Sequence, residues 1–166
     1  MPDIKTGTIQ ITGLSELDKR LRELPDKLAR NVMRGAVRAG AAVIQKEAKA
    51  RVPVAKKAHL LKSYKSKLWK HYRAAKYGTW IQPGNIKRNI KVSPAKKAPR
   101  GTIEYHVYIS DKNKNTYYWK FLEFGTSKMA AKPFMRPAFE AQKEAATVAI
   151  REYMAKRIDK ELGNAR

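Results

Sequence analysis

The sequence predicts an α+β fold in which a small antiparallel sheet packs against long helices near both ends of the chain. Apolar residues recur at helical spacing over residues 25–51 and again over 136–162. They alternate at strand spacing over residues 103–110. This order of helices and strands along the chain is an α+β arrangement. Between them lies a basic middle segment, about 54–100, which we expect to be partly irregular.

The N-terminal part predicts a short strand and two helices. Residues 8–12 alternate and are rich in β-branched side chains. Beyond Gly13, leucines recur at spacings of three and four, which marks one face of a helix: Leu14, Leu17, Leu21, Leu24 and Leu28. Pro25 either kinks this helix or begins a second one, and we prefer the second interpretation. The second helix ends near Arg51, before Pro53, and its expected buried stripe is Leu28, Val32, Ala36, Gly40, Val43 and Ile44.

Beyond residue 60 the sequence predicts a turn, two strands, an aromatic segment and a last helix. Residues 60–70 have room for one or two helical turns, Pro83-Gly84-Asn85 predicts a turn, and the spacing of Ile86, Ile90 and Val92 predicts a strand over 86–92. The clearest strand is 103–110. Residues 117–124 are rich in aromatic side chains and fit either a strand or a short helix. Gly125 ends this segment, and the last helix follows over 136–162, with Gly163 as a stop signal.

Length and composition bound the class of protein. The chain has 166 residues, 43% of them hydrophobic, so we expect one domain over residues 1–166 with a basic, insertion-like segment at 54–100. It contains no cysteine, which excludes disulfides, thiolate metal sites and a cysteine nucleophile. No secretory signal and no run of about 18 apolar residues is visible, so we expect no membrane partner.

The net charge of +23 points to an anionic partner. No acidic residue occurs between Glu47 and Glu104, whereas Lys49 to Arg100 contains 16 lysines and arginines. Aromatic side chains are interleaved with cations there, a pattern that suits bases and phosphates of nucleic acid. The alternative is that the aromatic side chains are core or interface anchors and the lysines a solvated rim. The possible DNA contacts are Lys62, Lys65, Lys67, Lys70, Arg73 and Lys76.

No catalytic or cofactor site is predicted. His59, His71 and His106 do not stand at metal-ligand spacing with other ligands, and phosphate-loop and dinucleotide motifs are absent. His106 falls on the polar side of the predicted strand 103–110, so it is expected to lie on the surface. We therefore expect no catalytic residue, no metal and no cofactor.

The most specific string spans residues 121–140, Phe-Leu-Glu-Phe-Gly-Thr-Ser-Lys-Met-Ala-Ala-Lys-Pro-Phe-Met-Arg-Pro-Ala-Phe-Glu. An aromatic segment ends at a glycine, where we expect a positive φ, and two prolines then fix the start of the last helix. Arg136 stands in a first turn, where the helix dipole disfavours a cation, so we expect an acidic partner for it, either Glu123 or Glu140 or a neighbouring chain. The residues expected at an oligomer or partner interface are Phe121, Glu123, Phe124, Gly125, Pro133, Phe134, Arg136 and Pro137.

This string resembles the signature of the tail-component family of long-tailed double-stranded DNA phages, typified by the tenth gene product of the lambdoid phage Hong Kong ninety-seven. The Gly13-Leu14-Ser15-Glu16-Leu17 and Arg51-Val52-Pro53 motifs are similar to those of the family as well. The middle departs from it. Residues 58–63 are the nearest match to the family's Gly-x-Leu-x-x-Ser motif, with Ala58 in place of the glycine, and Lys65 to Arg100 is longer and more basic.

The resemblance implies a virion structural protein of the neck or tail-completion type, which forms a homo-oligomeric ring at the head-tail junction. Its expected partners are itself, other phage neck and tail proteins, and genomic DNA in transient, non-specific contact. Its expected location is the virion, and the host cytoplasm during assembly. The alternative, favoured by charge alone, is a non-specific nucleic-acid-binding protein associated with ribosomes or the nucleoid. An enzyme is disfavoured because no site is visible.

Overall fold

The computed structural model describes residues 24–61, 79–96, 98, 99, 101–111 and 116–163, together with Leu17 and Arg22. In this part of the chain the elements follow in the order α2 (Asp26–Arg51), β1 (His59–Leu61), β2 (Thr79–Ile81), α3 (Asn85–Asn89), β3 (Ile90–Pro94), β4 (Tyr105–Ile109), α4 (Trp119–Phe124) and α5 (Met135–Gly163). The α+β class is confirmed: two long helices pack with small antiparallel sheets. The expectation of a single domain over 1–166 stays a prediction.

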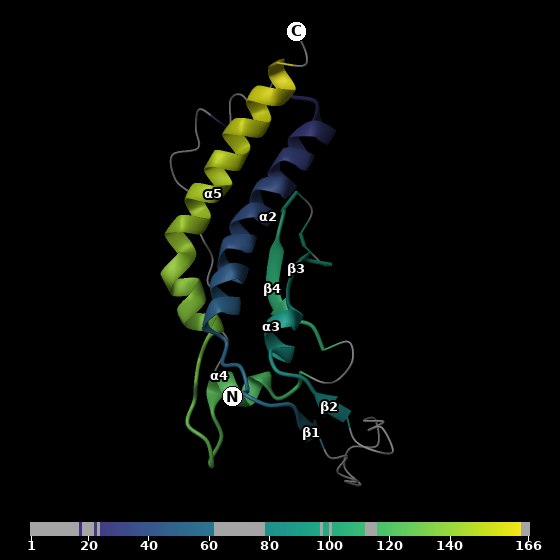
Figure 1. Ribbon diagram of the computed structural model, residues 1–166. Coiled ribbons are helices and arrows are strands. Elements are labelled where there is room, and N and C mark those ends of the chain that lie inside the picture. The colour runs from purple at the N-terminus through teal and green to yellow at the C-terminus, as the bar shows by residue number, and fades with distance from the viewer. Residues whose placement is uncertain are drawn as a thin grey trace.

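Helices α2 and α5 lie side by side in opposite directions and form the long body of the molecule (Figure 1). The boundaries of α2 follow from its prolines. Pro25 is the N-cap, and its carbonyl accepts hydrogen bonds from the N–H groups of Leu28 and Ala29 at 2.8 and 3.0 Å. At the other end Val52 is extended, with ψ 128°, because the residue before a proline is disfavoured in the helical region.

Nearly every fourth residue of each long helix is buried where the two meet. On α2 this row comprises Val32, Ala36, Gly40, Ile44 and Ala48, and on α5 it comprises Ala146, Ile150, Met154 and Ile158. Members of both rows share one apolar cluster with Leu24, against which Leu17 packs. The predicted stripe of α2 is confirmed at Val32, Ala36, Gly40 and Ile44, whereas Val43 is half-buried. The prediction that Leu28 is buried was wrong: this residue is 37% exposed, and Leu24, which precedes the helix, joins the core instead.

Strands β3 and β4 form an antiparallel pair on a different side of α2 from α5 (Figure 1). Their register pairs Ile90 with Ile109 and Val92 with Val107. A second apolar cluster joins the sheet to the C-terminal end of α2 and the start of α5: Ala48, Val52, Ile86, Ile90, Ile109, Phe134 and Ala138. The side chain of Gln45 also reaches the sheet, where its Nε2 donates to the Ile90 carbonyl at 2.8 Å.

One local prediction was wrong, a second is corrected at its start, and one alternative is settled. The expected strand 86–92 begins only at Ile90, because Gly84 adopts φ 71° and starts the short helix α3, which places both Ile86 and Ile90 in the core. Residues 59–61 form a strand paired with β2, so no helical turn begins at Leu60, and the rest of the segment 60–70 lies outside the described residues. The aromatic segment ends in the short helix α4. The strand 103–110 is confirmed over 105–109, with alternating burial.

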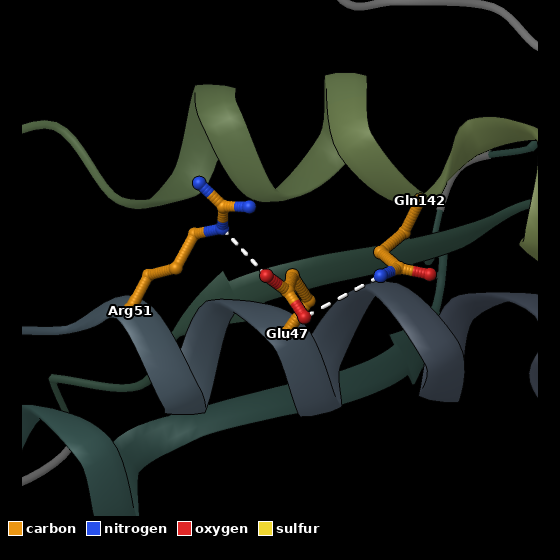
Figure 2. Close-up of polar contacts among 3 residues, drawn as sticks. All are labelled: Glu47, Arg51 and Gln142. Atoms are coloured by element: carbon orange, nitrogen blue, oxygen red, sulfur yellow. Dashed lines mark hydrogen bonds and ion pairs between the residues drawn. The ribbon is translucent and has the colours of Figure 1, made fainter.

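A polar bridge supplements the contact between the long helices. Glu47 on α2 accepts from Arg51 Nε at 2.6 Å through Oε1 and from Gln142 Nε2 on α5 at 3.4 Å through Oε2 (Figure 2). Glu47 thereby links the two helices at the level of Gln142. No helix among the described residues is long and apolar enough to cross a bilayer.

The closest approach of the helices yields a test. A Cβ on Gly40 would lie 2.6 Å from Ile150 Cγ1 and 3.0 Å from the Ala146 carbonyl oxygen, both in the packed interior. We expect Gly40→Ala to lower the free energy of unfolding by about 1 kcal/mol or more, because overpacking outweighs the gain in helix propensity. Chemical denaturation measures this difference.

Gly35→Ala is the matched control. Its Cβ would meet the ring of Tyr153, but that side chain is 38% exposed and can swing into solvent. We expect this variant to be as stable as the wild type or more stable by up to about 1 kcal/mol. Equal destabilisation of the two variants would contradict the assignment of Gly40 as the tight contact.

Candidate functional site

The signature string folds into one turn that joins α4 to α5, at the end of the molecule that also carries β1 and β2 (Figure 1). Helix α4 ends at Gly125, which adopts φ 73° as predicted and donates its N–H to the Phe121 carbonyl at 3.0 Å. A Cβ at this position would lie 2.9 Å from both the Ala131 nitrogen and the Met129 carbonyl oxygen. Backbone angle and backbone crowding therefore both require glycine here.

The loop beyond Gly125 closes on itself and then returns to α4. Thr126 and Met129 form an isolated antiparallel bridge, with the Thr126 N–H donating to the Met129 carbonyl at 2.9 Å. The Lys132 N–H donates to the Leu122 carbonyl at 2.7 Å. These bonds bring the chain back past α4 before α5 begins.

The carboxylate of Glu123 holds the start of α5. Its Oε2 accepts from the N–H groups of Phe134 and Met135 at 2.8 and 3.0 Å, and its Oε1 accepts from the N–H of Arg136 at 3.0 Å. Glu123 is buried, at 7% exposure, and an anion at a helix N-terminus also opposes the helix dipole favourably. A side chain of α4 thus caps a helix that begins twelve residues later.

This cap completes the backbone hydrogen bonding of the first turn. A helix leaves its first N–H groups without internal partners, and a buried group of this kind is costly. Glu123 accepts from three of them, Pro137 has no N–H, and the N–H of Ala138 makes the first regular bond, to Phe134 at 3.2 Å. The spacing of glutamate, proline and arginine in the signature therefore has a structural cause.

The turn separates the predicted interface residues into two groups. Glu123 and Phe134 are buried and hold the turn together; Phe134 has no exposed surface. Phe121 and Phe124 lie one helical turn apart on α4 and are 46% and 45% exposed. Pro133 and Arg136 are exposed, whereas Gly125 and Pro137 are half-buried.

The expectation for Arg136 needs correction within this chain. Glu123 accepts from its backbone N–H and not from its guanidinium, because the carboxylate is occupied by the helix terminus. Glu140 lies 3.6 Å from Lys143 Nζ instead. Among the described residues no ion pair of the Arg136 side chain is found, so a partner in a neighbouring chain stays a prediction.

The predicted DNA contacts, Lys62, Lys65, Lys67, Lys70, Arg73 and Lys76, lie outside the described residues, as does His71. Strands β1 and β2 stand on either side of that stretch in the chain. His106 is exposed as predicted, with its Nε2 3.4 Å from Glu104 Oε1. In the described ranges no group of three or more His, Asp or Glu side chains is arranged to hold a metal ion.

Residues 15–125 match a family model described as "Bacteriophage HK97-gp10, putative tail-component". The chain belongs to this family. The match spans α2 through α4 and ends at Gly125, so it includes Glu123 but not the helix that Glu123 caps. Comparison with curated proteins and with solved structures gives no match. Membership makes the chain a structural tail component of a bacteriophage and confirms the predicted resemblance.

The cap can be tested by substitution. Glu123→Ala leaves three N–H groups at the start of α5 without their acceptor, so we expect the free energy of unfolding to fall by about 2–4 kcal/mol. Glu123→Gln keeps one acceptor oxygen and should lose less. Thermal and urea unfolding measure both.

Glu104→Ala is the control, because it removes a carboxylate that is 43% exposed and contacts only the exposed His106 ring in the described structure. Its expected cost is below about 0.5 kcal/mol. If Glu123→Ala is as stable as this control, the carboxylate is not what holds the start of α5.

Proposed function

We propose that this tail component works at the neck or in tail completion, as a homo-oligomeric ring at the junction of head and tail. Its partners are then other copies of itself and the neighbouring neck and tail proteins. It is located in the virion, and in the host cytoplasm during assembly. The role is structural rather than enzymatic, and it needs no metal or cofactor.

The observation that carries this proposal is the exposure of Phe121 and Phe124 on a rigid support. Large aromatic side chains that remain exposed together are typical of protein interfaces, where they act as anchors. Helix α4 is fixed near its C-terminal end by the buried Glu123 and by Gly125, so the two rings stand in a defined position. A protein that must lock into an assembly needs such a preorganised contact.

The experiment compares virions assembled with different variants. We expect Phe121→Ser/Phe124→Ser to fold normally, because both side chains are about half exposed, but to be incorporated into particles about tenfold less, since aromatic anchors supply much of the binding energy at interfaces. Electron micrographs of particles made with and without the protein locate the defect. Tails that fail to join heads are the expected phenotype.

Leu28→Ser/Met33→Ser provides the matched control. These side chains are 37% and 36% exposed, and they lie in the first half of α2, far along the molecule from α4. Normal joining with the aromatic variant, or head-tail joining without the protein, would contradict the proposal.

The high charge suits a second role of the same ring. The genome passes through the junction, and DNA carries about one negative charge per 1.7 Å of axis, so cations around the channel attract it. Lysine gives attraction without fixed bidentate geometry, which suits DNA that must slide. We assign this contact to the cationic run 62–76. The alternative function, a non-specific nucleic-acid-binding protein, rests on the net charge of +23 alone and requires a monomer that binds RNA tightly at low salt.

Salt dependence tests the DNA contact. Changing Lys65, Lys67, Lys70 and Arg73 together to Gln should weaken DNA binding equally for all DNA sequences. It should also reduce the slope of log K against log salt concentration by about 2–4, because binding then releases fewer counterions from the DNA. The control changes Lys91, Lys96, Lys156 and Lys160 to Gln, which removes the same charge elsewhere. An equal loss of slope in both variants would show that net charge acts alone and that the run makes no particular contact.

A further inference from the structure

The outer side of α2 carries cations along its length. Arg30, Arg34, Arg38 and Lys46 are exposed and recur every fourth residue, with the exposed Ala42 in the remaining position. Each stands two residues from the buried row that faces α5, and two residues turn an α-helix by about 200°. This row therefore points away from α5. Within the described residues none of the four makes an ion pair.

The outer side of α5 carries acids in the same arrangement. Glu140, Glu144 and Glu152 are exposed every fourth residue, and Val148, which is 49% exposed, fills the gap. This row likewise stands two residues from the buried positions Ala146, Ile150 and Met154. The cationic row and the acidic row thus lie on opposite sides of the helix pair, where they cannot meet within one chain.

The two rows are in step along the molecule. Glu47 contacts Gln142, Gly40 approaches Ile150 and the Ala146 carbonyl, and Gly35 approaches Tyr153. Because the helices are antiparallel, these contacts place Lys46 near the level of Glu144, Ala42 near Val148, and Arg38 near Glu152. The order on both faces is charge, apolar, charge, over about 12 Å of helix. One turn further on, Arg34 stands at the level of Lys156, which ends the matched segment.

We propose that the α2 face of one copy, Arg38, Ala42 and Lys46, docks against the α5 face of the next copy, Glu144, Val148 and Glu152. Charge complementarity selects a second copy of this chain, because opposite charges stand at equal levels with an apolar pair between them. A symmetric contact would oppose cation to cation, so the contact is heterologous. Matched levels need no translation of one copy along the helices of the next. With a rotation between copies that divides a full turn, as the proposed ring requires, such a contact closes rather than forming a filament.

This inference rests on the proposed ring and names the surfaces that form it. It also explains how copies with a large net positive charge associate. Association depends on the local charges that face one another at the contact, and distant charges are screened within about 10 Å at 0.1 M salt. The contact should therefore weaken with salt while its apolar centre remains.

The test uses two variants of the full chain. The first, Arg38→Glu/Lys46→Glu, makes both faces acidic, and the second, Glu144→Lys/Glu152→Lys, makes both faces basic. Each alone should need at least about tenfold more protein to assemble than the wild type, as followed by sedimentation velocity and native mass spectrometry. Mixed in equal amounts, they should assemble like the wild type, because every contact then pairs an acidic face with a basic one.

Lys91→Glu/Lys96→Glu serves as the control. It changes the net charge by the same amount as the first variant, but on exposed residues in and next to β3. Circular dichroism establishes that each variant folds, and Arg38→Gln/Lys46→Gln provides a milder version. A wild type that stays monomeric at low salt, a first variant that assembles normally, or a mixture that stays apart would each overturn the proposal. If Arg38→Glu/Lys46→Glu loses DNA binding but assembles normally, the proposal is overturned and the α2 face is a DNA-binding surface instead.

Failure of this proposal is separate from failure of the proposed function. If the charge variants assemble normally while tails made without the protein still fail to join heads, only the assignment of the α2 and α5 faces to the contact is wrong. If heads and tails join without the protein, the function is wrong whatever the charge variants do.

Discussion

The end of the molecule that carries α4 depends on the hydrogen bonds that the buried carboxylate of Glu123 accepts. This carboxylate accepts hydrogen bonds from the N–H groups of Phe134, Met135 and Arg136, and so ties the C-terminal end of α4 to the start of α5. Because α4 has only six residues, it has little intrinsic stability and relies on such tertiary contacts. The same bonds fix where α5 begins, and α5 in turn forms the body of the molecule with α2.

The long helices meet through small residues because their backbones approach closely. Gly40 and Ala146 lie at this contact, and a side chain larger than hydrogen at Gly40 would overlap Ile150. Because every fourth residue of each helix is buried against the other helix, the residues halfway between them lie on the opposite side and face solvent. The packing that stabilises the fold therefore also decides which charges face outward and at which level.

The regular part of this fold could be predicted from the sequence. The long periodic segments gave α2 and α5 within one or two residues, and alternation gave β4, because periodicity directly reflects which face is buried. The error at 86–92 arose because Ile86 and Ile90 fit a helical turn as well as a strand, and the positive φ of Gly84 decides between them. Leu28 was misplaced because leucine periodicity continues across Pro25, where the helix restarts.

The sequence of residues 121–140 predicts the backbone angle of the turn but not the contact that holds it. A glycine that follows an aromatic run suggests a positive φ, so the role of Gly125 can be predicted. The role of Glu123 cannot be, because its partners are backbone groups eleven to thirteen residues away, and no periodic pattern carries such a contact. The sequence predicts Glu123 as a possible partner for the Arg136 side chain, whereas its carboxylate accepts from the backbone N–H of that residue; its place at an interface stays a prediction.

The distribution of charge separates two kinds of cation in this chain. Helix α5 carries six basic and five acidic residues, whereas α2 carries seven basic and two acidic ones, and one of these acids, Glu47, is paired with Arg51. Cations on a rigid helix have fixed spacing and can recognise a partner with matching spacing, as a sheet or helix face recognises its complement. Lysines bind phosphates as point charges without a fixed geometry, so a lysine-rich run suits a polymer that moves past it. A tail component with the proposed role, which locks to its neighbours and lets DNA pass, has reason to keep the two kinds apart. Here α2 carries four arginines and three lysines, whereas the middle segment 54–100 carries eleven of the 24 lysines.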